Sequence, residues 1–102
     1  MENDKTPCIW NVFKANENLK KHNVSFEEAE TVFEDPNKVF YYDDEHSYDE
    51  DRYVVVGISS FTKLLMVCHC YRQKDGSEII RIISARKATA LECEWYKRGG
   101  KF

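Results

Sequence analysis

Two arginines in the last quarter of this 102-residue chain have the chemistry needed to bind a phosphodiester. Arg81 lies within a β-branched run, and Arg86 lies just before an expected helix start at Thr89. A guanidinium group can bind a phosphate through two parallel N–H bonds, and it stabilises the extra negative charge of a pentacovalent phosphorane. The amino end of a helix favours the same anion. The sequence therefore predicts that Arg81 and Arg86 bind phosphate, with Lys87 beside them.

The same cations also have ordinary structural explanations. Arg81 could pair with a carboxylate on the expected sheet, either Glu78 or an acid of the segment 43–51. Arg86 and Lys87 could be solvated surface charges, because structural ion pairs and exposed cations outnumber catalytic ones. Residue type alone does not separate these explanations from phosphate binding.

Three consecutive cations, Lys20, Lys21 and His22, end an expected helix over residues 12–22. Cations in a last turn offset the negative end of the helix dipole, which is enough to explain them. An imidazole can also exchange protons near neutral pH, so His22 could act as a general base on a ribose 2′-hydroxyl or as an acid to the leaving oxygen. Either lysine could neutralise a phosphate.

Other candidate sites have weaker support. Tyr96, near the end of the last expected helix, could donate a proton or stack on an unpaired base, although such a tyrosine more often packs. The segment 43–51 holds six acids and a histidine, but it lacks the glycine and glutamate spacing of a calcium loop and is expected to be solvated. On a strand, His69 must point opposite to Cys68 and Cys70, which argues against a zinc site. No metal or cofactor is predicted.

Two helices are expected to precede the strands. Val12, Ala15 and Leu19 recur at helical spacing and predict the helix that ends at the three cations. Ser25, followed by Glu28 three residues later, forms a capping box that starts a second helix at residue 26. The sequence therefore predicts two helices in succession before the strands, preceded by Ile9-Trp10, which could be a short strand or an apolar anchor.

Four runs of β-branched and aromatic residues predict strands over residues 39–42, 53–58, 64–71 and 78–83. The dipeptide 75–76 is Asp-Gly, which suits a tight hairpin turn and would place Cys70 opposite Arg81. Thr89 and Glu92 form a second capping box that opens a final helix. The order predicts an α+β domain whose mainly antiparallel, four-stranded sheet is covered on one face and open to a ligand on the other.

Length and composition limit the possible functions. The chain has room for one domain, expected over residues 9–98, with a flexible segment at 1–8 and a tail at 99–102. The longest apolar run, residues 64–68, is too short to span a bilayer, so no membrane role is expected. The four cysteines have no Cys-x-x-Cys spacing and fit a reducing cytoplasm. With a formal net charge of −3, binding to nucleic acid would need a local basic patch.

Fragments of the sequence, taken in order, resemble the BrnT family of bacterial toxins. They are Trp10, residues 18–29, Val32-Phe33-x-Asp35-Pro36, Asp44-x-His46-Ser47, Glu50-x-Arg52-Tyr53, Gly57 and residues 81–89. The resemblance runs from about Ile9 to Tyr96. It implies a RelE-like fold and a metal-independent endoribonuclease toxin that uses the RNA's own 2′-hydroxyl as nucleophile and inhibits translation.

The resemblance also implies partners and site residues. The partners would be RNA and a DNA-binding, BrnA-like antitoxin, so that DNA would be contacted only indirectly. On the matched positions, the implied catalytic residues are Lys21, His22, Arg81 and Arg86, and the implied RNA-binding residues are Lys20, Lys87 and Tyr96. Asn23 replaces the glycine usual after the Lys-His pair, but asparagine tolerates a left-handed conformation. The alternatives are a catalytically inactive module that binds the antitoxin and modulates its operator occupancy, or a metal-binding domain that uses the acidic segment.

Overall fold

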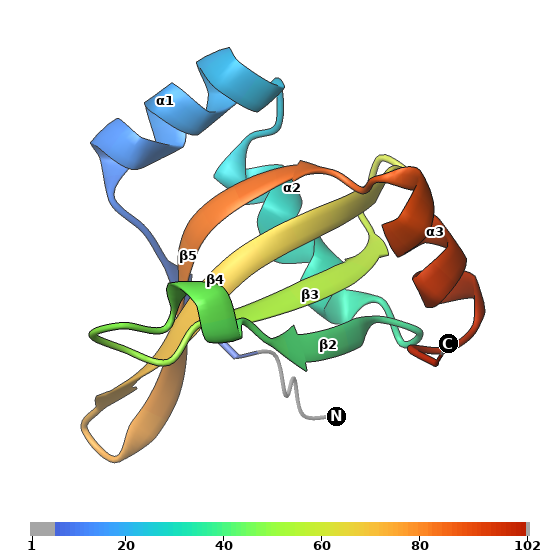
Figure 1. The fold of residues 1–102 in the computed structure, drawn as a ribbon. Coiled ribbons are helices and arrows are strands. Elements are labelled where there is room, and N and C mark those ends of the chain that lie inside the picture. Colours follow the sequence, from blue (N-terminus) through green and yellow to red (C-terminus); the bar gives the residue numbers. More distant parts are fainter. Residues whose placement is uncertain (1–5, 102) are drawn as a thin grey trace, which may run out of the picture.

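The computed structural model describes residues 6–101, which form a five-stranded sheet with helices around it (Figure 1). The elements are β1 (Cys8–Ile9), α1 (Val12–His22), α2 (Phe26–Thr31), the 3₁₀ turn η1 (Val32–Glu34), β2 (Val39–Tyr42), the 3₁₀ turn η2 (Asp44–His46), β3 (Tyr53–Ile58), β4 (Leu64–Lys74), β5 (Ser77–Lys87) and α3 (Ala90–Lys97). The predicted α+β class and the order of helices and main strands are confirmed. No helix within residues 6–101 is long and apolar enough to cross a membrane.

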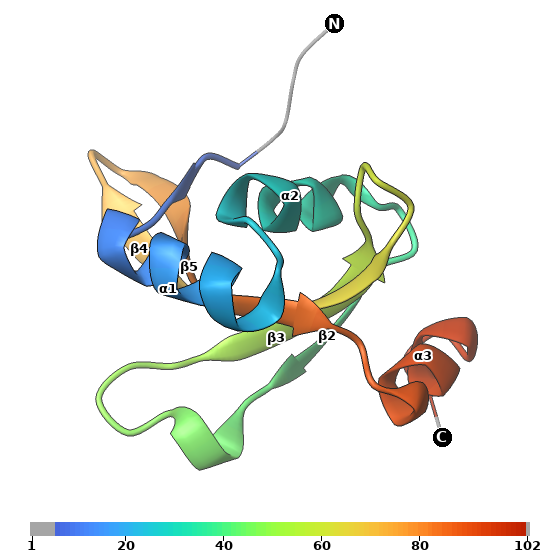
Figure 2. The ribbon, with the colours of Figure 1, turned by 90° about the horizontal axis from the view of Figure 1, so that it is seen from above.

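The strands lie in the order β1-β5-β4-β3-β2. Strands β2 to β5 pair antiparallel, as predicted, with Cys70 opposite Arg81. Figure 2 shows α2 on one side of the sheet and the segment that contains η2 on the other. The helical side therefore carries the core, and the opposite side is covered only in part.

The prediction of four strands was wrong, because β1 adds a fifth strand to the edge of the sheet. β1 pairs parallel to β5, with Cys8 opposite Ile80, and the Pro7 carbonyl accepts a hydrogen bond from the Ile80 amide at 2.9 Å. Two residues are too few to show strand periodicity, so only the free edge of β5 defines this strand. Pro7 and Cys8, within the segment expected to be flexible, thus lie against the sheet, while residues 1–5 are outside the described part of the chain.

The hydrophobic core lies between α2 with η1 and the inner face of the sheet. Phe26 and Ala29, on the predicted second helix, are fully buried. The core cluster consists of Val24, Phe26, Ala29, Val32, Val55, Leu65, Val67, Ile80, Ile82 and Ala85. Burial of these apolar side chains fixes which face of β4 and β5 points inward, and thereby which face can hold a site.

The helix predicted over residues 12–22 is confirmed as α1, but two of the three apolar residues whose spacing predicted it are exposed. Val12 and Leu19 are 66% and 46% exposed, whereas Asn18 is only 6% exposed. The Asn18 amide donates to the carbonyls of Val24 (3.0 Å) and Ala85 (2.9 Å), and its oxygen accepts from the Ala85 amide (3.0 Å). A buried amide with these partners has only a small desolvation cost, so hydrogen bonds from Asn18 attach α1 to β5, together with Ala15, which packs against the core.

One of the two predicted capping boxes is incomplete. The Ser25 hydroxyl accepts from the Glu28 amide at 3.0 Å, as predicted. The Glu28 carboxylate, however, accepts a hydrogen bond from the Ser59 hydroxyl at 2.7 Å instead of bonding back to Ser25. Glu28 is buried, so this long-range contact ties α2 to the turn between β3 and β4. At Thr89, both halves of the box are present.

Candidate active site

A β-bulge in β5 brings the two arginines predicted to bind phosphate onto the same face of the sheet. Arg81 and Arg86 are five residues apart, so in a regular strand their side chains would point to opposite faces. The pairing of β5 with β4 shifts at Ile83, which is left without a partner in the ladder. Ile82 and Ala85, on either side of the shift, are both in the core. Arg81 and Arg86 consequently both lie on the face opposite the core.

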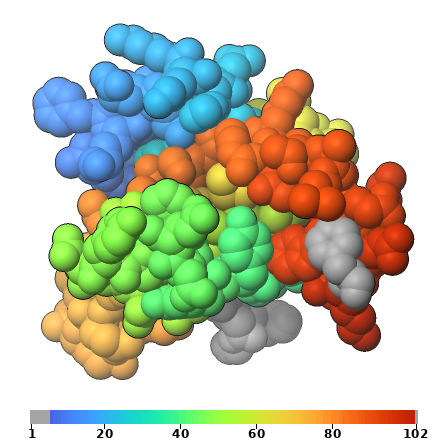
Figure 3. Space-filling view, viewed as in Figure 1, coloured from blue at the N-terminus to red at the C-terminus, as the bar shows by residue number. Residues whose placement is uncertain are grey.

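Two hollows adjoin at this bulge. The hollow that we call the arginine hollow has a volume of about 440 Å³ and is lined by Tyr41, Tyr42, Asp43, Asp44, Glu45, His46, Arg52, Val54, Met66, Cys68, Ile83, Ser84 and Arg86. The second, the helix hollow, has a volume of about 380 Å³ and is lined by Lys14, Glu17, Asn18, Lys21, His22, Ile83 and Ser84. Ile83 and Ser84 belong to both. In Figure 3, part of β5 (orange) lies between α1 (blue) and the segment around η2 (green).

The shared residues bring together side chains that the sequence separates by more than sixty positions. Lys21 and His22 lie on one side of Ile83 and Ser84, and Arg86 lies on the other. Arg81 is on the same face of β5 but lines neither hollow. Lys20 is exposed on α1 and also lines neither.

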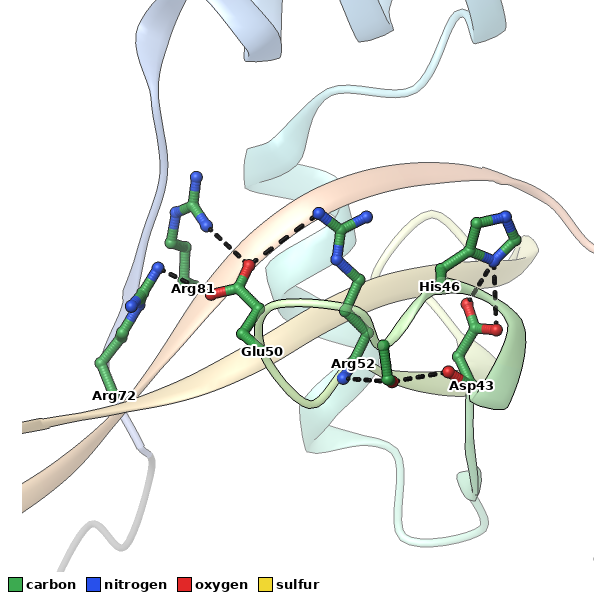
Figure 4. A network of polar contacts seen from close by, with 7 residues as sticks. Asp43, His46, Glu50, Arg52, Arg72 and Arg81 are labelled. Carbon is green, nitrogen blue, oxygen red and sulfur yellow. Dashed lines mark hydrogen bonds and ion pairs between the residues drawn. The ribbon is translucent and has the colours of Figure 1, made fainter.

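Arg81 is paired with an acid of the segment 43–51, one of the two structural partners that the sequence allowed. The Glu50 carboxylate lies 3.4 Å from Arg81 Nη1, 2.9 Å from Arg72 Nη2 and 3.9 Å from Arg52 Nη2. Figure 4 shows this carboxylate between the three guanidinium groups. The acidic segment is therefore not merely solvated, because Glu50 is held over the sheet by cations from β4 and β5.

Arg86 is also paired, which excludes the alternative that it is an unpaired surface charge. Its Nη1 and Nη2 donate to the two carboxylate oxygens of Glu92 at 2.9 and 3.0 Å. The same carboxylate accepts from the Thr89 amide at 2.8 Å. Burial of Glu92 opposes its ionisation, but Arg86 and the Thr89 amide together hold its pKa below the usual value. The cap of α3 thus fixes the orientation of Arg86, while Lys87 beside it is exposed.

The sequence suggested His46 only as part of a possible metal loop and gave Arg52 no role, whereas the structure places both in the arginine hollow. The Asp43 carboxylate oxygens lie 3.0 and 3.1 Å from His46 Nδ1. The guanidinium Nε of Arg52 is buried and has no hydrogen-bond partner among residues 6–101. The only signal in the sequence was that both residues occur in fragments that resemble the BrnT family. Their convergence depends on the fold of η2 and could not be found from spacing.

Tyr96 lies apart from these residues. Its hydroxyl donates to Asp35 Oδ2 at 2.6 Å, and the same oxygen accepts from the Ile58 amide at 2.8 Å. Burial and the Asp35 carboxylate raise the pKa of Tyr96 to about 12. Tyr96 therefore links α3 to the turn before β2 and lines neither hollow.

Two further side chains, Cys68 and His69, are uncharged near neutral pH and take no part in acid–base chemistry there. Burial raises the pKa of the Cys68 thiol in the floor of the arginine hollow, which keeps it neutral. His69 lies on the opposite face of β4, as predicted. The centroid of its ring is 4.8 Å from that of the Phe33 ring, and its Nε2 atom lies 3.2 Å from the Tyr71 hydroxyl. Within residues 6–101, no group of three or more His, Cys, Asp or Glu side chains is placed to hold a metal ion.

Comparison with known proteins assigns the fold and the family. Residues 10–92 match the family model described as "Ribonuclease toxin, BrnT, of type II toxin-antitoxin system". The crystal structure of the Brucella abortus ribonuclease toxin BrnT is similar in fold, with a TM-score of 0.59, 22% identity, and coverage of 82% of this chain and 97% of that chain. No curated protein matches the sequence. Because the family model spans most of the chain, this protein belongs to the BrnT family of toxins of type II toxin–antitoxin systems.

Proposed function

We propose that this protein is a metal-independent endoribonuclease that inhibits translation in the cytoplasm. The observation that supports the proposal most strongly is the bulge in β5, where the helix hollow and the arginine hollow share Ile83 and Ser84. Proton-transfer groups from α1 and a phosphate-binding guanidinium from β5 thereby lie around one surface. General acid–base catalysis and charge stabilisation are the two contributions that RNA cleavage through the 2′-hydroxyl requires.

In the proposed reaction, the RNA supplies its own nucleophile. The 2′-oxygen forms a bond to the adjacent phosphorus, the bond from phosphorus to the 5′-oxygen breaks, and the products carry a 2′,3′-cyclic phosphate and a 5′-hydroxyl. Arg86 binds the phosphate and stabilises its developing charge, while Arg81, on the same face of β5 but outside both hollows, binds the adjoining part of the RNA backbone. His22 and Lys21 transfer a proton or neutralise charge.

Binding of RNA must compete with carboxylates that already occupy the arginines. Glu50 binds Arg81 and Glu92 binds Arg86. A phosphate oxygen would have to displace a carboxylate oxygen to bind either guanidinium group. Lys20 and Lys87 are exposed and extend the contact with the RNA backbone. We do not assign an RNA contact to Tyr96, since its hydroxyl is bonded to Asp35.

Membership in a type II toxin–antitoxin family implies an antitoxin partner. We propose that this partner is a DNA-binding protein of the BrnA type, so that the toxin contacts DNA only through it. Formation of the complex would then inhibit RNA cleavage, because a partner that covers either hollow excludes the substrate.

The proposal is tested with the purified full-length protein, a single-stranded RNA and excess EDTA. We expect cleavage with cyclic phosphate ends, slowed at least tenfold by Lys21→Ala, His22→Ala and Arg86→Ala. Lys63→Ala and Arg98→Ala are matched controls, because these exposed cations line neither hollow. Cleavage that requires a divalent metal, or that all three variants leave unchanged, would contradict the proposal.

The second candidate is a catalytically inactive module that binds the antitoxin and modulates its occupancy of the operator. It is favoured by the exposed apolar residues near the start of α1, where Val12 and Phe13 are 66% and 81% exposed. It is also favoured by the ion pairs that already neutralise Arg81 and Arg86. A protein that binds its antitoxin but leaves RNA intact under all conditions would support this candidate over the nuclease.

A further inference from the structure

The arginine hollow contains a histidine and a carboxylate that the proposed reaction does not use. His46, in the turn η2, is 59% exposed, whereas the Asp43 side chain is only 17% exposed. Asp43 contacts the Nδ1 atom of His46, so the other ring nitrogen, Nε2, is the one left available. This arrangement is the one in which a carboxylate orients an imidazole for proton transfer.

The Asp43 carboxylate determines which ring nitrogen of His46 carries a proton. An ionised carboxylate only accepts hydrogen bonds, so His46 must present a proton at Nδ1. In the neutral imidazole, the lone pair then resides on Nε2, and Nε2 can accept a proton. Asp43 thereby selects the tautomer of His46 that is competent as a base.

The turn that carries this pair is closed by hydrogen bonds on both sides. The Asp43 amide donates to the Arg52 carbonyl at 2.9 Å. The Ser47 hydroxyl donates to the Asp43 carbonyl at 2.6 Å and accepts from the Arg52 amide at 2.9 Å. These bonds fix the base of the turn, and with it the relative positions of His46 and Arg52. Preorganisation of this kind is what proton transfer to a bound substrate needs.

Two guanidinium groups line the same hollow as His46. Arg86 is oriented by Glu92, and Arg52 has a buried Nε without a partner among residues 6–101. An unsatisfied donor of this kind is costly in an empty site and favours an anionic oxygen that completes it. A phosphate between Arg52 and Arg86 would lie in the hollow that His46 enters.

On the premise that the protein cleaves RNA as proposed above, we infer that His46 is the general base of the reaction and that Asp43 is its positioning residue. His46 Nε2 takes the proton of the 2′-hydroxyl as the bond from the 2′-oxygen to phosphorus forms. The 5′-oxygen leaves as its bond to phosphorus breaks, and it receives a proton from His22 on the other side of Ile83. One proton is taken up and one is released, so the two histidines exchange protonation states in each turnover.

The first experiment separates catalysis from binding. We expect His46→Gln to slow cleavage of a single-stranded RNA by at least about 10²-fold, the usual contribution of a general base. Its affinity for the same RNA carrying 2′-O-methyl groups, which cannot react, is expected to stay within twofold. Arg86→Ala is the contrast, since it should weaken that affinity. Asp43→Asn should slow cleavage less than His46→Gln, because it misorients the base without removing it.

The second experiment distinguishes base from acid. In an RNA whose bridging 5′-oxygen is replaced by sulfur, the leaving group needs no proton. We expect this substrate to restore the rate of His22→Ala but not that of His46→Gln. Added imidazole should in turn restore part of the activity of His46→Gly, a recovery that a purely structural role for His46 would not produce.

The outcomes assign failure to one hypothesis or the other. If the unaltered protein cleaves RNA and His46→Gln cleaves it as fast, the inference is wrong while the nuclease proposal stands. If the sulfur substrate restores His46→Gln, then His46 is an acid and the assignment as base is overturned. If the unaltered protein cleaves neither substrate, the nuclease proposal itself is refuted, and this inference with it.

Discussion

Lowering the pH from 7.5 to 5 is expected to destabilise the protein through one buried histidine. His69 is fully buried, and this burial lowers its pKa from 6.5 to about 4, although a hydrogen bond to the Val67 carbonyl acts in the opposite direction. The unfolded chain therefore takes up a proton near pH 6.5, whereas the folded protein does not do so until near pH 4. The stability that neutral His69 contributes is complete above pH 6.5 and is lost as the pH falls toward 4.

The size of the effect follows from the two pKa values. Each pKa unit corresponds to about 1.4 kcal/mol, so the full effect is about 3 kcal/mol. Of this, about 2 kcal/mol is lost between pH 7.5 and pH 5. The carboxylates whose pKa values are lowered, such as Glu92, contribute mainly below this range. The free energy of unfolding of a small domain is typically about 5–15 kcal/mol, so a loss of about 2 kcal/mol at pH 5 is easily measured.

The assay is urea unfolding at a series of pH values between 7.5 and 5, with the free energy of unfolding taken by linear extrapolation. His69→Gln lacks the ionisable group and should show a flatter dependence on pH, from a lower starting stability. His22→Gln is the matched control for the substitution itself, because it replaces an exposed histidine on another element with the same amide side chain. An equal slope in the unaltered protein and in His69→Gln would refute the reasoning.

Three further results are expected. Glu50→Gln should raise the affinity for single-stranded RNA roughly threefold at low salt, because it releases Arg81 and Arg72 from partly buried ion pairs, and ion pairs near the surface are worth up to about 1 kcal/mol. The gain should shrink as salt is added, and a loss of affinity would show that Glu50 positions the arginines for RNA. Asn18→Ala should lower the free energy of unfolding by about 2 kcal/mol, because it leaves the Ala85 amide and carbonyl without their partner; urea unfolding within about 0.5 kcal/mol of the unaltered protein would contradict this role. Tyr96→Phe should lower the free energy of unfolding by about 1 kcal/mol through loss of its hydrogen bond to Asp35, with RNA cleavage unchanged. A selective loss of cleavage would instead show that Tyr96 takes part in the reaction.

The sequence by itself determined the elements whose signals are local. The helix predicted over about residues 12–22 is α1 (Val12–His22), and Asn23 ends it in the left-handed conformation, with φ of 58°. The capping box of α3 forms with both of its bonds. These features depend on side chains within one or two turns of the same helix, so spacing along the chain contains the information that they need.

The sequence did not determine which faces of the helices and strands pack against each other. The buried residue of α1 is Asn18, which bonds to Ala85, and the Glu28 carboxylate bonds to Ser59 instead of completing its capping box. These partners lie 67 and 31 residues away along the chain. Strand β1 exists only because the edge of β5 is free to pair with it. Each of these outcomes is set by contacts between distant segments, which no local pattern encodes.

The chemistry of the candidate site divides in the same way. The types of residue that can bind phosphate and move protons were evident from the sequence, since charge and ionisation are properties of the side chain. That Arg81 and Arg86 face the same side was decided by the bulge at Ile83, which depends on how β4 and β5 pair along their length. That His46 and Arg52 line a hollow with Arg86 was decided by the way the segment between β2 and β3 lies against the sheet, because only the folded chain brings these side chains to one surface.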